Sequence, residues 1–201
     1  MDQNARDTFA VPNREFDRTA LLAAERGLQR ADPSSSIALL DSTAASTASI
    51  EENLASNTAR FAAPDWLAEA LTKNGCTHLL LITRHRAQAR IHTSRGSVGS
   101  GTLMGLGLYL DRALRTKRSD TGERAFGLIA PFAYFELTLI DVTNGRIVSQ
   151  QNVTASRMIS AARNTTNGDP WDTLTAEEKT RVLNEMLERE VPDAIASMIH
   201  P

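Results

Sequence analysis

The chain has 201 residues and a formal net charge of −2, with 41% hydrophobic and 23% charged residues. This composition is that of an ordinary soluble globular protein, and the charge balance does not favour nucleic-acid binding. The single cysteine excludes an internal disulfide, and no apolar run reaches the roughly 20 residues of a membrane-spanning helix.

The first fifteen residues are polar, and we expect a flexible N-terminal segment followed by a single domain over residues 16–201. The segment MDQNARDTFAVPNREF has no apolar stretch like that of a signal peptide. We therefore expect either a cytoplasmic protein or a mature periplasmic or envelope protein whose signal peptide has been removed.

Apolar residues at helical spacing predict a helix over residues 16–30. Residues 37–40 suggest a short strand. A Ser/Thr/Ala-rich loop over residues 42–49 then leads to a second helix, which Ser49 would cap and which would run through Ala59. A third helix opens at Pro64-Asp65 and stops at Asn74-Gly75.

The next segment, residues 77–91, is predicted to be a long strand. Its second half alternates, so that Arg84, Arg86, Gln88, Arg90 and His92 share one face. A glycine-rich turn leads to a return strand over residues 103–110, and residues 112–124 form a charged loop.

Residues 126–156 predict the central hairpin of the sheet. Its first strand has apolar residues on both faces, which is typical of a central strand. Asn144-Gly145 favours a type I′ turn, and the polar run after it predicts an edge strand. Pro131 lacks an N–H group, so we expect it at a strand end or a bulge. Asp141 is expected to stabilise the turn.

Thr175 and Glu178 form a capping box for a closing helix, which Pro192 should kink or split. The elements add up to an α+β fold: a largely antiparallel, mixed sheet of about five strands, helices packed on it and a C-terminal helix. Successive strands tend to be neighbours, so we expect the sheet order to follow the chain.

No pattern in the chain predicts a catalytic centre, a cofactor or a metal. The glycines at 99, 101 and 105 miss the dinucleotide-binding spacing, and a strand follows them where that motif needs a helix. His78, His85 and His92 do not converge on one strand face, as metal ligands must. We therefore expect a non-enzymatic protein without a cofactor.

Charge is segregated along the chain, with arginines between residues 84 and 118 and acidic residues after residue 168. The arginines form either a solvated face or a contact surface for an anionic partner, which includes the chain's own acidic helix. The aliphatic face of the return strand is either covered by a helix or exposed for binding. The possible interaction surface comprises Arg84, Arg86, Arg90, Arg95, Met104, Leu106 and Leu108.

The segment LTLIDVTNGRIV, residues 137–148, resembles a hairpin found in bacterial envelope proteins. It is similar to hairpins of the curli-secretion lipoproteins, the penicillin-binding-protein activator lipoproteins and the amino-terminal domain of TolB. The preceding helix, loop and apolar strand follow the same layout from about Pro64. The resemblance implies an α/β sandwich that acts through protein contacts, often with a lipid anchor. This chain lacks the anchoring cysteine near its start, and Ser149 replaces the usual tryptophan.

These observations lead us to expect a non-enzymatic assembly or interaction module of the bacterial envelope, whose partner is another protein or a second copy of the chain. One alternative is a small-ligand-binding protein or enzyme with a site between the sheet and the helices, near Tyr134, Glu136 and His78. A further alternative is a basic hairpin that binds anionic surfaces; nucleic acid is not expected, because few aromatic residues lie among the arginines.

Overall fold

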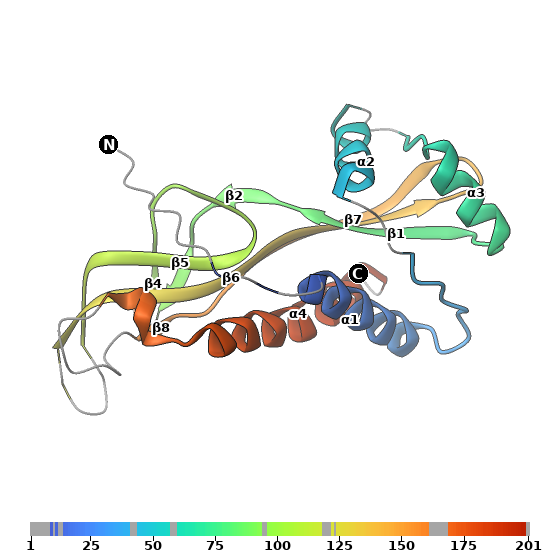
Figure 1. Cartoon of the computed structure of the whole chain (residues 1–201). Helices are drawn as coiled ribbons and strands as arrows, with labels where there is room; N and C mark the ends of the chain where they lie inside the picture. Colours follow the sequence, from blue (N-terminus) through green and yellow to red (C-terminus); the bar gives the residue numbers. More distant parts are fainter. Residues whose placement is uncertain are drawn as a thin grey trace.

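The computed structural model describes residues 9, 11, 14–40, 44–56, 60–93, 96–117, 122, 124–160 and 169–199. The predicted α+β fold is confirmed: a long antiparallel sheet carries a pair of helices along one face and two further helices at one end (Figure 1). The predicted flexible segment, residues 1–15, lies largely outside the described residues.

Strand β6 (Arg124–Asp141) is the centre of the sheet and pairs with all its neighbours in antiparallel orientation. On one edge it pairs with β5 (Thr102–Lys117) and then, further along, with β1 (His78–Arg84). On the other edge it pairs with β7 (Arg146–Ser156) and the short β8 (Ile159–Ser160). The prediction that the sheet order follows the chain is therefore wrong, because β1 and β5 share one edge of β6.

The long strand predicted after the third helix is broken into β1, β2 (Arg86–Gln88) and β3 (Ile91–Thr93). The break follows from the arrangement around β6. The N–H of His85 donates to the carbonyl of Tyr134 (3.0 Å), and beyond that point β5 occupies the edge of β6, so β2 pairs with β5 instead. The charged loop predicted at residues 112–124 is wrong at both ends, since β5 continues as a strand to Lys117 and β6 begins at Arg124; residues 118–121 and 123 lie outside the described residues.

Strand β3 pairs with β4 (Gly96–Val98) in a separate two-stranded sheet that packs on the central strand. Ile91 is fully buried in a cluster with Leu128 and Ala130. This packing explains why alternate residues of the 84–92 segment are exposed although the strand is broken.

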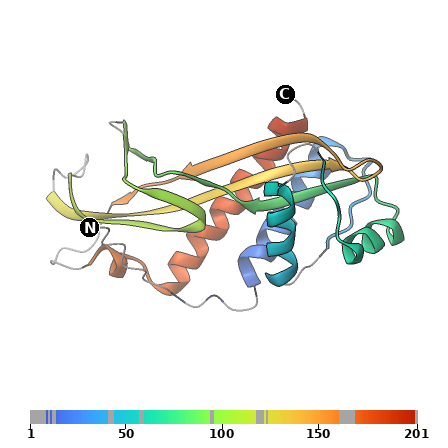
Figure 2. The same cartoon turned by 90° about the horizontal axis from the view of Figure 1, so that it is seen from above.

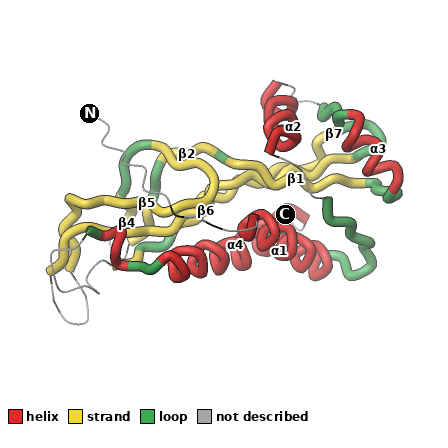
Figure 3. The backbone as a smooth tube through the Cα atoms, viewed as in Figure 1, coloured by secondary structure: helices red, strands yellow, loops and turns green. Residues whose placement is uncertain are grey.

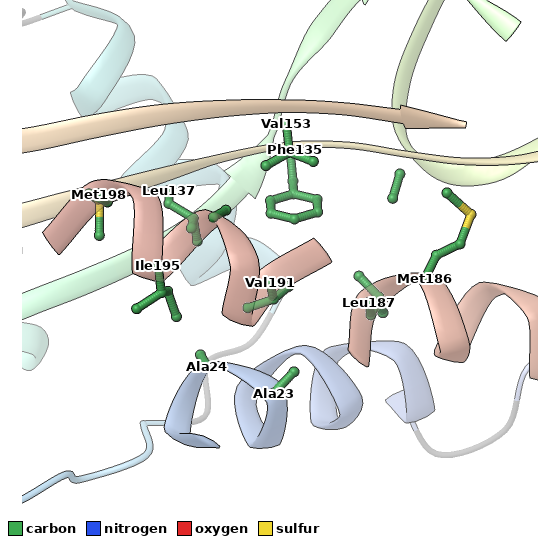
Figure 4. Packing of buried hydrophobic residues seen from close by; sticks show 12 residues of the cluster. Ala23, Ala24, Phe135, Leu137, Val153, Met186, Leu187, Val191, Ile195 and Met198 are labelled. Atoms are coloured by element: carbon green, nitrogen blue, oxygen red, sulfur yellow. The ribbon is translucent and has the colours of Figure 1, made fainter. Parts of the chain in front are cut away.

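Helix α4 (Ala176–Ile199) packs against β6 and β7 and also against α1 (Glu15–Ala31), and buried residues of all four elements form one cluster (Figure 4). Phe135 and Leu137 of β6 meet Ile195 of α4 in this cluster. Both helices were predicted, and the capping box is confirmed by the bond from the Glu178 N–H to Thr175 Oγ1 (3.2 Å) and its reciprocal (2.9 Å). Pro192 does not split α4, which continues through it as one helix.

Helices α2 (Ala44–Ser56) and α3 (Asp65–Lys73) lie at the end of the sheet on the opposite face from α1 and α4 (Figure 3). Ile50 and Leu71 pack there with Ile140 of β6. The loop predicted at residues 42–49 is wrong from Ala44 on, because α2 begins there. Ser49 therefore lies inside the helix and does not cap it. Residues 37–40 form no strand, and Ala59 lies outside the described residues.

The turn between β6 and β7 is longer than the predicted type I′ turn. Asp141 pairs with Arg146, which leaves residues 142–145 in the loop, and among the described residues only Gly145 of these four has a positive φ, +69°. The Asp141 carboxylate accepts hydrogen bonds from the Thr143 N–H (2.8 Å) and the Asn144 side-chain amide (2.9 Å), which confirms its predicted role. These hydrogen bonds lower the pKa of the Asp141 carboxyl below its ordinary value.

Pro131 lies in the middle of β6, so the prediction of a strand end or bulge is wrong. Its carbonyl accepts from the N–H of Arg157 (3.1 Å), and residue 157 lies between β7 and β8. Because the N and carbonyl of one strand residue point to the same side, the missing N–H of Pro131 falls at this gap.

Candidate interaction surfaces

The predicted interaction surface is divided by the fold. Leu106 and Leu108 are half-buried on β5, in register with Ala133 and Pro131, and pack in clusters that contain residues of α4. The aliphatic face of the return strand is thus covered by a helix. Met104, at the start of the same face, is 51% exposed.

The predicted arginines also have different surroundings. Arg84 makes two hydrogen bonds to the Glu51 carboxylate of α2, at 2.7 and 3.2 Å. These bonds raise the pKa of the Arg84 guanidinium and tie β1 to α2. Arg95 lies outside the described residues.

Arg86, Arg90 and Met104 are exposed, and we call these three residues the ribbon surface. Arg86 is in register with Met104 across the β2–β5 pair, and its guanidinium donates to the Thr102 hydroxyl (3.3 Å). The backbone of Arg90 is anchored to β6, since its N–H donates to the buried Tyr134 hydroxyl (3.1 Å). The ribbon surface therefore consists of an arginine and a methionine paired across β2 and β5, and of a second arginine whose backbone is anchored on β6.

The acidic C-terminal part of the chain meets the basic part at one ion pair among those described. Arg112 Nε lies 2.7 Å from Asp169 Oδ2 and lowers the pKa of that carboxyl. An acidic residue of the chain itself therefore serves as the partner of Arg112, while Met104 of the ribbon surface lies near the other end of β5.

The outer edge of β7 is a second candidate interaction surface. The sequence predicted β7 as an edge strand but not as a contact surface. Figure 2 shows β7 in orange as the outermost strand on one side of β6, with β1 in green on the other side. The edge-strand prediction is confirmed. The signal for a contact surface was present in the sequence, since residues 147–156 include no charged residue and no proline.

The three residues predicted for a ligand site do not converge. Tyr134 is fully buried, and its hydroxyl is engaged by the Arg90 N–H and the Gln88 carbonyl. Glu136 is half-buried and accepts from Thr138 and Gln150. His78 is exposed and pairs with Asp141, five residues along β6 from Glu136.

A hollow of about 330 Å³ lies instead between α3 and the β6–β7 turn. Its walls include Phe61, Leu71 and Ile140, and its rim includes Arg60 and Asn144. The predicted ligand residues do not line it.

Within the described residues no three potential metal-ligating side chains gather, and no helix combines the length and the apolar character needed to cross a bilayer. No protein-family model, no curated protein and no solved structure matches the chain.

Proposed function

We propose that the protein is a non-enzymatic interaction module of the bacterial cell envelope that works through protein contacts. The observation that carries this proposal is the ribbon surface, where Met104 stands exposed opposite Arg86. Arginine and methionine are enriched in protein interfaces, and methionine adapts its shape to a partner. The arginines would favour a partner with carboxylates around an apolar patch.

The envelope location rests on the resemblance of the β6–β7 hairpin. Its context supports the proposal: α3, a short loop and the apolar strand β1 precede the hairpin, and β1 pairs with β6. The test is to fractionate cells that express the full native gene product and to determine its amino terminus by mass spectrometry. A processed form in the periplasm or membrane is the expected result; an unprocessed form in the cytoplasm would overturn the envelope location.

A second candidate function, binding of a small ligand, is favoured by the hollow next to α3. Its apolar walls and few polar rim groups are the general pattern of a ligand site. Leu71→Trp would fill this hollow. If the hollow binds a ligand, a small apolar probe such as an indole should raise the melting temperature of the native protein and leave that of Leu71→Trp unchanged.

A further inference from the structure

The outer edge of β7 has backbone groups that point away from the sheet, and two hydrogen bonds identify them. The Tyr134 carbonyl accepts from His85, on the β1 side, and the Pro131 carbonyl accepts from Arg157, on the β7 side. Backbone groups of successive strand residues alternate in direction, so odd-numbered residues of β6 bond to β7. Their register partners on β7 are Ser149, Gln151, Val153 and Ala155.

It follows that the N–H and carbonyl groups of Gln150, Asn152 and Thr154 point outward. All three side chains are exposed. We call residues 150–154 the edge window. The described part of the chain limits the window on both sides: Arg60 bridges to Arg146 at one end, and Ser156 Oγ bonds to the Arg90 carbonyl (2.8 Å) at the other.

The edge window lacks the features that usually prevent strands from pairing between molecules. Edge strands are commonly protected by charged side chains, by proline or by being very short. Strand β7 has eleven residues, and none of those from Ile147 to Ser156 is charged or proline. Its bulge lies at Val148, before the window, where the register to β6 shifts.

The window is also symmetric about Asn152, which suits a second copy of itself. In an antiparallel pair centred there, Asn152 would face Asn152 of the partner subunit, and Gln150 would face Thr154 of the partner subunit. All outward groups would be used in roughly six backbone hydrogen bonds. No like charges would meet within the window, and its amide and hydroxyl side chains could bond across the pair.

We propose that β7 is a homodimer interface, in which the edge windows of two copies pair antiparallel around a twofold axis at Asn152. A self-complementary contact of this kind is the commonest arrangement in homo-oligomers. A contact between the β7 edge of one copy and the β1 edge of another would be heterologous and would leave one edge of each kind open, whereas pairing of β7 with β7 is closed. The contact extends the proposed interaction role, and Arg90 of the ribbon surface lies beside one end of the edge window, where its carbonyl accepts from Ser156 Oγ.

The test is sedimentation equilibrium of the purified full chain at concentrations up to about 1 mM. We expect reversible dimerisation. Asn152→Pro removes an outward N–H and blocks the approach of a second strand, while proline is tolerated where the N–H faces solvent. Asn152→Lys brings two like charges together at the axis. Each variant should weaken the dimer about tenfold or more.

Two controls separate pairing from folding. Gln88→Lys adds the same charge at an exposed site on β2 and should dimerise like the native chain. Gln151→Pro removes an N–H that bonds to β6, so it should lower the melting temperature, whereas Asn152→Lys should not. A native chain that stays monomeric throughout overturns the proposal, and so does a dimer that both Asn152 variants retain. The assay uses purified protein, so its outcome is independent of cellular location.

Discussion

The ring of Phe132 lies over Gly107 on the neighbouring strand. The two residues are in register between β6 and β5, and a Cβ added to Gly107 would come within 2.8 Å of Phe132 Cζ. The glycine therefore provides the space for this ring, which also packs edge-on against Tyr134 with the ring centroids 5.6 Å apart.

Gly107→Ala should consequently lower the free energy of unfolding by about 1–3 kcal/mol, because the added methyl group overfills the site. In a Phe132→Ala background the same substitution should cost much less, since the ring is gone. Chemical denaturation of the two single variants and the double variant measures this coupling. Equal costs in both backgrounds would show that the ring and the glycine are independent.

Gly145 should tolerate alanine less well than Gly75 does. Both have positive φ values, +69° and +62°, so both substitutions carry backbone strain. A Cβ at Gly145 would also lie 2.4 Å from the Phe61 carbonyl oxygen, while nothing lies within 4 Å at Gly75. We expect Gly145→Ala to be the more destabilising by at least about 1 kcal/mol, as measured by denaturant titration. Equal losses would mean that the contact with Phe61 is unimportant.

The Tyr134 hydroxyl should hold the start of β3 against the sheet. Tyr134→Phe removes the acceptor of the Arg90 N–H and should cost about 0.5–1.5 kcal/mol. Hydrogen exchange of the Arg90 amide should become faster in this variant. Tyr109→Phe is a suitable comparison, because its hydroxyl accepts from Ser100 in an exposed position; it should leave Arg90 exchange unchanged. Unaltered Arg90 exchange in Tyr134→Phe would contradict this role.

The β6–β7 turn should weaken in acid. The Thr143 N–H, followed by the Thr143 and Asn144 side chains, lowers the pKa of Asp141 below its ordinary value of 3.8 in the folded state. A carboxyl whose pKa is lower in the folded state adds stability above the unfolded pKa and loses it as pH falls through the folded pKa.

The stability difference between the native chain and Asp141→Asn should therefore be present at about pH 5 and shrink below pH 3.8. Urea titrations across this range measure it. The cost of Gly75→Ala involves no ionisable contact and should not change with pH. A difference for Asp141→Asn that is equally flat would argue against the ionised carboxylate as the stabilising form.

Local patterns predicted the local features well. The alternation from Arg84 to His92 correctly predicted which side chains are exposed, and the apolar faces around Phe135 predicted a central strand. The Asn144-Gly145 signal located the turn but not its type, because the Asp141 side chain bonds two residues of the loop and favours a longer turn.

What the sequence did not reveal depends on contacts between distant segments. Leu106 is covered by α4, which begins about seventy residues later in the chain. Arg84 looked like part of a basic face, but its partner Glu51 lies 33 residues earlier. The exchange of β1 for β5 along β6 leaves no periodic signal in the sequence.

Site-specific photo-crosslinking in living cells tests most directly whether the ribbon surface contacts another protein. A photoreactive amino acid would replace Met104 and, in a matched control, Leu22 of α1, which is 41% exposed. We predict a discrete adduct of higher mass from position 104, lost when Arg86 and Arg90 are changed to glutamate, and none from position 22. The absence of an adduct from position 104, or an equal adduct from both positions, would contradict the proposed contact.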